Sequence, residues 1–171
     1  MDGHLPGLTS KNNKITGKSS VGGNSGDSGW TTDDNLLAQN NKIEGITNVG
    51  GCIGYASHYY SNSNNIKSEG AKQIISGQNY VGGTIGRSKG KIKNAKAEEC
   101  TIKATGSYGG GIVGCSEYST TSISTSNNSN FAIAGAKAKK VNLTVGLNYA
   151  GGIVGYQVGS VYGTVLEDSI I

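Results

Sequence analysis

Short apolar groups recur along the chain at nearly regular intervals, and each is associated with a pair of glycines. The clearest copy is Gly151-Gly152-Ile153-Val154-Gly155, matching strings begin at Gly110, Gly82 and Gly50, and a degenerate copy begins at Gly22. Successive copies start 28, 32, 28 and 41 residues apart. A period of about 20–50 residues is typical of solenoids and repeat arrays. The pattern therefore predicts a repeat architecture.

Alternation of apolar and polar residues predicts three short strands in each repeat. In one repeat they are expected over residues 80–86, 92–95 and 100–104. Three strands of about five residues and their corners fill a coil of roughly 28 residues. We therefore predict an all-β fold, a parallel β-solenoid (β-helix) of about five coils that forms one domain over residues 12–171. Residues 1–11 are expected to be an irregular lead. Residues 36–38 are expected to form one helical turn, capped by Asp33 or Asp34, that serves as an end cap.

Three glycines in each of the last four copies are expected to be structural. Glycine at a strand corner supplies a positive φ or lets another backbone come close. The predicted set is Gly50, Gly51, Gly54, Gly82, Gly83, Gly86, Gly110, Gly111, Gly114, Gly151, Gly152 and Gly155. The apolar residues between these glycines are expected to form one buried column, made of Ile53, Ile85, Val113 and Val154.

Two polar segments lengthen the period, at residues 58–65 and 116–130. Insertions into solenoid repeats map to loops, which often bind ligands. The candidate binding-loop residues are His58, Tyr59, Tyr60, Asn62, Tyr118, Thr120 and Thr121.

Tyrosine is frequent, with nine residues, and several recur at one repeat position. Tyr80, Tyr108 and Tyr149 each lie two residues before a glycine pair, and Tyr55 and Tyr156 share a second position. Aromatic residues in one column pack on each other, so a purely structural role is one interpretation. Exposed tyrosines would instead suit sugars or proteins, because the ring is apolar and the hydroxyl polar.

The repeated string of Tyr or Val, then Val or Ala, Gly-Gly, a variable residue, Ile or Val, and Gly resembles the GLUG motif, named for its glycine-leucine-variable-glycine core. The match covers about residues 12–171, and the usual leucine is replaced by Cys52, Thr84, Ile112 or Ile153. GLUG repeats occur in bacterial surface and secreted proteins, including adhesins and the non-catalytic regions of immunoglobulin A peptidases. The resemblance implies a repeat scaffold and transfers no catalytic residue.

The charge of the chain and its potentially reactive residues argue against nucleic-acid binding, metal binding and proteolysis. The net charge of +4 is mild, and Arg87 is the only arginine, so lysine clusters at residues 89–96 and 137–140 are interpreted as solvated strand faces rather than as a nucleic-acid interface. The three cysteines show no metal-site spacing and are expected to be free buried thiols, although one disulfide remains an alternative. Gly26-Asp27-Ser28-Gly29 is similar to the segment around the nucleophile of trypsin-like proteases, but no histidine is placed to assist it. We predict no catalytic residue, cofactor or metal site.

The leading hypothesis is a non-enzymatic extracellular or cell-surface module, a stalk or adhesin whose loops bind a host or surface glycan or protein. One alternative is a self-assembling filament subunit that associates through the open end at residues 169–171. Another is a carbohydrate-active β-helix enzyme that uses the carboxylates at Glu98-Glu99 or Glu167-Asp168. No apolar run reaches the length of a membrane span, and no signal peptide is visible, so the chain is expected to be part of a longer protein.

Overall fold

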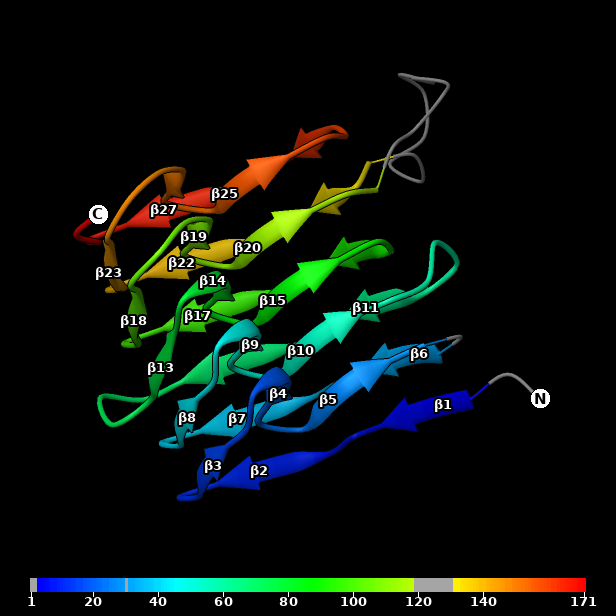
Figure 1. Cartoon of the computed structure of the whole chain (residues 1–171). Helices are drawn as coiled ribbons and strands as arrows, with labels where there is room; N and C mark the ends of the chain where they lie inside the picture. Colours follow the sequence, from blue (N-terminus) through cyan, green and yellow to red (C-terminus); the bar gives the residue numbers. More distant parts are fainter. Residues whose placement is uncertain (1–2, 30, 119–130) are drawn as a thin grey trace.

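The computed structural model describes residues 3–29, 31–118 and 131–171, and over these residues the chain is a parallel β-solenoid (Figure 1). Five short strands, one from each of five sheets, make one coil, and each coil lies on the preceding one from the N-terminal to the C-terminal end. We name the sheets A to E in the order in which the chain enters them. The predicted fold class is confirmed.

Every sheet is built from strands that are five elements apart in the chain. Sheet A contains β1 (Gly3–Pro6), β6 (Thr31–Asp34), β11 (Asn62–Asn64), β16 (Lys91–Lys93), β21 (Ile133–Ala134) and β26 (Val161–Tyr162). Sheet B contains β2 (Thr9–Lys11), β7 (Leu37–Gln39), β12 (Lys67–Glu69), β17 (Lys96–Glu98), β22 (Lys137–Lys139) and β27 (Val165–Glu167). Sheet C contains β3 (Lys14–Thr16), β8 (Lys42–Glu44), β13 (Ile74–Gly77), β18 (Thr101–Ala104) and β23 (Asn142–Val145). Sheet D contains β4 (Ser19–Gly22), β9 (Thr47–Gly50), β14 (Asn79–Gly82), β19 (Gly109–Gly110) and β24 (Ala150–Gly151). Sheet E contains β5 (Ser25–Ser28), β10 (Ile53–Ala56), β15 (Ile85–Ser88), β20 (Val113–Ser116) and β25 (Val154–Gln157).

The coil differs from the prediction in having five strands instead of three. The segment predicted as one strand over residues 80–86 bends at its glycines and contributes to both β14 and β15. A strand that was not predicted, β17, lies between the other two. Five strands need more corners in each coil than the three strands that the apolar pattern predicts.

Two expectations for the N-terminal part need correction. The lead over residues 1–11 contains β1 and β2, which pair with β6 and β7, whereas residues 1–2 lie outside the described range. The expected helical turn over residues 36–38 is absent, because Asp34 ends β6 and Leu37 begins β7. Asp33 does not cap a helix: its carboxylate is buried inside the coil and accepts a hydrogen bond from Ser28 (2.7 Å).

The core is a thin stack of residues that repeat from coil to coil. Register pairs Ile53 with Ile85, Ile85 with Val113, and Val113 with Val154, as predicted. The first three of these are fully buried, and Val154 in the last coil is partly buried. Sheet C supplies a second apolar column, made of Ile15, Ile43, Ile75, Ile102 and Leu143. Each coil therefore buries its apolar side chains against those of its neighbours, as a solenoid requires.

The repeated glycines act through close backbone approach and not through positive φ. A Cβ on Gly82 would overlap the carbonyl oxygen of Ile85 in the same coil, and a Cβ on Gly83 would overlap the carbonyl oxygen of Gly111 in the next. A Cβ on Gly86 would lie 2.4 Å from the backbone nitrogen of Val49 in the preceding coil. The three glycines of one repeat therefore permit contacts within the coil and on both sides of it.

The corners that need positive φ are formed mainly by asparagine and tyrosine. Asn35, Asn65 and Asn94 occupy one corner, between sheets A and B, with φ of 56°, 52° and 52°. Tyr80 and Tyr108 occupy another, in sheet D, with φ of 57° and 69°. Asparagine tolerates this left-handed conformation better than most residues, whereas tyrosine is unusual there.

We expect Gly82→Ala to prevent folding or to lower the free energy of unfolding by at least about 4 kcal/mol, because the new methyl group meets backbone on both sides of the corner. The control is Gly29→Ala, where a Cβ would find no atom within 4 Å, so the change should stay within about 1 kcal/mol. Urea unfolding followed by circular dichroism measures both. Equal stabilities of the two variants would contradict the close-approach role.

Candidate functional site

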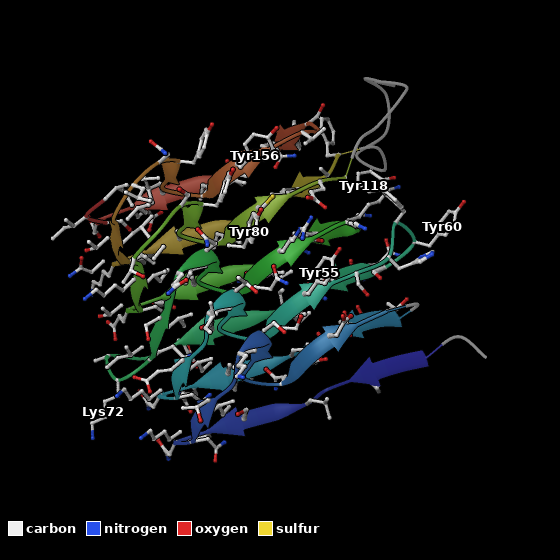
Figure 2. All side chains as sticks on the ribbon, in the orientation of Figure 1. Tyr55, Tyr60, Lys72, Tyr80, Tyr118 and Tyr156 are labelled. Carbon is white, nitrogen blue, oxygen red and sulfur yellow. The ribbon has the colours of Figure 1, made fainter. Side chains whose placement is uncertain are left out.

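The first predicted binding loop joins β10 to β11 and projects aromatic side chains into solvent. Tyr59 and Tyr60 are 52% and 76% exposed, and Tyr60 points away from the ribbon in Figure 2. The loop is held at its base by Ser61, which is buried and donates a hydrogen bond to the carbonyl oxygen of Gly29. The His58 ring lies 5.4 Å from that of Tyr60, and the Asn62 side chain donates to the Tyr60 carbonyl oxygen (3.2 Å).

The second predicted loop lies between β20 and β21, at the same junction of sheets E and A. Of its candidate residues, Thr120 and Thr121 lie outside the described residues. Tyr118 is partly buried and packs on the core, with the Lys91 ammonium 5.6 Å from its ring centroid. The scaffold thus holds Tyr118 at the same junction as the first loop, and Tyr60 and Tyr118 are labelled toward the same side of the molecule in Figure 2.

The tyrosine column in sheet D forms a continuous stack. The ring centroids of Tyr80 and Tyr108 are 4.8 Å apart at 15°, and those of Tyr108 and Tyr149 are 4.9 Å apart at 4°. Tyr156 meets Tyr108 and Tyr149 edge-on, with ring centroids 5.8 Å away in each case. The faces of Tyr108 are therefore covered by its neighbours and are closed to a sugar ring, whereas Tyr149 in the last coil is 52% exposed.

Arg87 continues this stack toward the N-terminal coils. Its guanidinium carbon lies 5.1 Å from the Tyr80 ring centroid and 5.2 Å from that of Tyr55, and one nitrogen is 2.6 Å from a Glu117 carboxylate oxygen. Arginine between aromatic faces gains a cation–π attraction on each side. The predicted column of Tyr55 and Tyr156 is interrupted, because register places Arg87 and Cys115 between them.

The three cysteines are free and buried. Burial raises the pKa of Cys100 to about 12 and that of Cys115 to about 11, and it raises the pKa of Cys52 further still. The thiol, and not the reactive thiolate, is therefore the species present near neutral pH. These residues fill the interior and give no sign of redox or metal chemistry among the described residues.

The other sequence candidates for chemistry do not converge. Glu98 pairs with Lys67 and Glu99 with Lys140, each at 3.5 Å. The hydroxyl of Ser28, in the protease-like segment, is buried and donates to Asp33. Within the described ranges, no group of three or more His, Cys, Asp or Glu residues is placed to hold a metal ion.

Large apolar side chains are exposed mainly in the final coil. Leu166 is 46% exposed, whereas the residues of its column in the inner coils are buried. Ile170 and Ile171 are 69% and 51% exposed. The same end exposes Leu147, Val158, Val161, Tyr162 and Val165. This apolar end is the surface on which the predicted self-association depends.

Comparisons with family models, curated proteins and solved structures found no match to the chain. In the described part of the chain, no helix is long and apolar enough to cross a membrane.

We expect Tyr108→Val to lower the free energy of unfolding by about 2–3 kcal/mol, because it removes two ring stacks and places a β-branched residue at φ of 69°. Tyr108→Asn removes the same stacks but suits the left-handed conformation, as Asn48 does at this position of its coil. The asparagine variant should therefore be more stable than the valine variant by about 1–2 kcal/mol. Chemical unfolding of both variants checks this order, and a valine variant at least as stable as the asparagine variant would contradict it.

Proposed function

We propose that the chain is a non-enzymatic β-solenoid module of an extracellular or surface-attached bacterial protein, and that it presents loops for adhesion to a host or surface glycan or protein. The scaffold is a stack of coils, and its two longest connections lie at one junction, between sheets E and A. The resemblance to GLUG repeats supports the extracellular setting.

The exposure of Tyr59 and Tyr60 carries this proposal. Both rings are largely solvent-exposed at the tip of a segment whose base is fixed by the buried Ser61. Aromatic residues that combine an apolar face with a polar tip are enriched at binding surfaces. Lys89 lies 5.8 Å from the Tyr59 ring and adds a positive charge beside the loop.

An adhesive role is favoured over carbohydrate cleavage because the carboxylate pairs are engaged elsewhere. Glu98 faces outward from sheet B in contact with Lys67, and Glu99 lies at the following corner with Lys140. Glycoside hydrolysis needs two carboxyl groups on opposite sides of one bond. Neighbouring residues that diverge into separate ion pairs do not meet that requirement.

The double variant Tyr59→Ser/Tyr60→Ser should lose most binding to a glycan array and to immobilised mucin, because the exposed rings supply the apolar contact area. Its melting temperature should stay within about 3 °C of the parent chain, since exposed side chains contribute little to stability. Array fluorescence and differential scanning calorimetry give the two readouts.

The comparison is Tyr149→Ser/Tyr156→Ser, which removes two exposed tyrosines (52% and 42%) from the stack in sheets D and E. This variant should keep its binding while losing some stability. Binding lost in this variant but kept in the loop variant would move the adhesive site to the tyrosine stack and refute the role of the loop.

A second candidate function, self-association into a filament or dimer, is favoured by the apolar end of the final coil. Among the described residues, no strand lies on the C-terminal side of Leu166 in β27 or of Ile170, which bridges to Asn142, so another chain could add apolar contacts and backbone pairing there. Head-to-tail pairing would extend into a fibre, whereas symmetric pairing would stop at a dimer. We propose that a second copy of the chain covers this end.

Light scattering should show a molar mass that rises with concentration for the parent chain and stays at the monomer value for Leu166→Lys/Ile170→Lys. The control is Ile74→Lys, a change at a 37% exposed position that follows Lys42 in its column. The control should associate like the parent chain. A parent chain that remains monomeric at millimolar concentration would rule out this role.

A further inference from the structure

Three adjoining surface hollows, of about 290, 190 and 370 Å³, run along sheet B and the corner that joins it to sheet A. The first two share Lys67 and Lys96, and the first and third share Asn94 and Gly135. Together they form one groove that crosses several coils in the direction of the solenoid axis. We call it the lysine groove, and its lining residues are distinct from those of the loop between β10 and β11.

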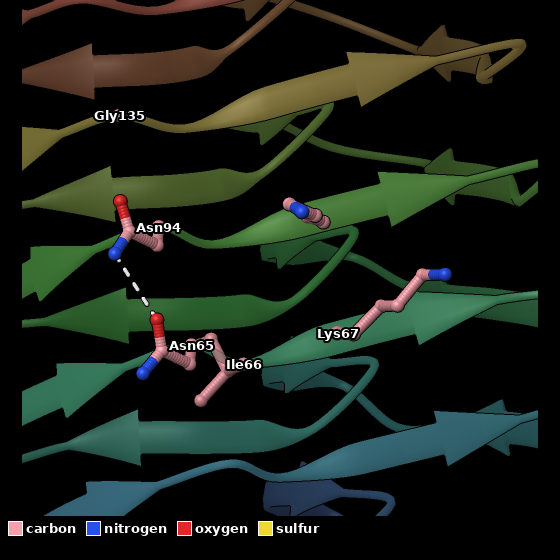
Figure 3. Close-up of a pocket in the computed structure, with 6 residues that line it drawn as sticks. Asn65, Ile66, Lys67, Asn94 and Gly135 are labelled. Carbon is pink, nitrogen blue, oxygen red and sulfur yellow. Dashed lines mark hydrogen bonds between the residues drawn. The ribbon is translucent and has the colours of Figure 1, made fainter.

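One wall of the lysine groove is a column of asparagines that ends abruptly. Asn94 donates a hydrogen bond from its amide nitrogen to the side-chain oxygen of Asn65 (3.0 Å), as Figure 3 shows. The next residue in the column is Gly135, with φ of 65°. Its missing side chain opens the hollow, because a Cβ there would lie only 2.6 Å from the side-chain oxygen of Asn94. Within the described chain, that oxygen accepts no hydrogen bond, and in Figure 3 it points toward Gly135.

The other wall carries cations in register. Lys67, Lys96 and Lys137 occupy the same position in three successive strands of sheet B. Lys67 contacts Glu69 and Glu98, and Lys137 contacts Glu167 at 2.9 Å. By contrast, Lys96 makes no ion pair with a described residue, and the same holds for Lys93 and Lys139, which also line the groove. Lys139 stands in register between Glu98 and Glu167, but those carboxylates pair with Lys67 and Lys137, so the ammonium groups of Lys93, Lys96 and Lys139 remain available to a ligand.

The chemistry of the groove matches a hydroxyl-rich polymer with moderate negative charge. Successive coils repeat about every 4.8 Å, so amide and ammonium groups are offered at a regular spacing to an extended chain. Carboxylates such as Glu98 accept hydrogen bonds from hydroxyl groups but repel the dense charge of a nucleic acid. At the C-terminal end, the Tyr162 ring is 51% exposed and is backed by Phe131 at 4.8 Å, which offers an apolar platform to a sugar ring.

We propose that the lysine groove binds an anionic polysaccharide, carrying carboxylate or sulfate groups, laid along the solenoid axis. Lys93, Lys96 and Lys139 hold the anionic groups, and the free side-chain oxygen of Asn94 accepts a hydroxyl hydrogen. The open space over Gly135 admits the sugar ring. This site does not depend on adhesion through the loop, since none of its lining residues belongs to the segment between β10 and β11.

The test uses the whole chain and three labelled polymers: polygalacturonate, dextran sulfate and neutral dextran. We expect at least one of the anionic polymers to bind, and neutral dextran not to bind. Lys93→Gln/Lys96→Gln/Lys139→Gln should weaken that binding by at least about tenfold, because each lost charge contact contributes modestly and the three add. The control Lys18→Gln/Lys72→Gln/Lys103→Gln changes the net charge equally on other surfaces and should bind like the parent chain.

Gly135→Asn separates groove shape from charge. Asparagine suits φ of 65°, and only the end of the Asn94 side chain must move, so the variant should fold. It fills the hollow and should also weaken polymer binding by about tenfold, with circular dichroism confirming the fold. The proposal is overturned if neither anionic polymer binds, if both triple variants lose affinity equally, or if Gly135→Asn binds normally. Tighter binding of an oligothymidine than of either polymer, lost in the groove variant, would also overturn it in favour of a nucleic acid.

Discussion

Backbone hydrogen bonding between successive coils is the interaction on which the rest of the structure depends. The amide of Cys52 donates to Thr84, that of Thr84 to Ile112, and that of Ile112 to Ile153, with distances of 2.8–2.9 Å. Such a series forms only if every coil superimposes on the next. Superposition in turn requires the corner of each coil to approach the backbone of its neighbours, which is why the repeated glycines leave no room for a Cβ. A thin apolar core is then sufficient, because each coil is covered on both sides.

The part of the fold that follows from this constraint was predictable from the sequence. The paired glycines and the column from Ile53 to Val154 gave the correct inward face and the correct register. The number of strands was not predicted, because it is set by left-handed corners that apolar periodicity does not report. Asn35, Asn65 and Asn94 occupy one such corner, and their regular spacing is the sequence feature that indicates it. The predicted helical turn failed because Asp33, which resembles a cap in isolation, points into the coil.

The candidate sites were predictable to a lesser degree. The exposed loop at Tyr59 and the stack of Tyr80, Tyr108 and Tyr149 were identified from interruptions and from recurrence at one repeat position. The structure adds that the tyrosine rings stack on each other, so their faces are covered by protein. Recurrence at one repeat position does not by itself distinguish stacked rings from exposed ones. The lysine groove was not predicted. Lys93 and Lys96 belong to one coil and Lys139 to the next, and only the pairing of β17 with β22 brings Lys139 to the same surface.

A column of identical residues on the surface of a solenoid is poorly suited to binding a ligand. Where one residue type fills a column, its side chains satisfy each other, as the tyrosine rings do by stacking and as Asn65 and Asn94 do by hydrogen bonding. A ligand finds unsatisfied groups only where the column changes. The step from Asn94 to Gly135 leaves an amide oxygen beside an open space. Lys139 replaces a glutamate in a column where Glu98 precedes it and Glu167 follows it, and those two carboxylates pair with Lys67 and Lys137 instead. Ligand recognition in this fold is therefore expected at positions where successive coils differ. Where the coils are identical, the side chains of one coil already contact those of the next.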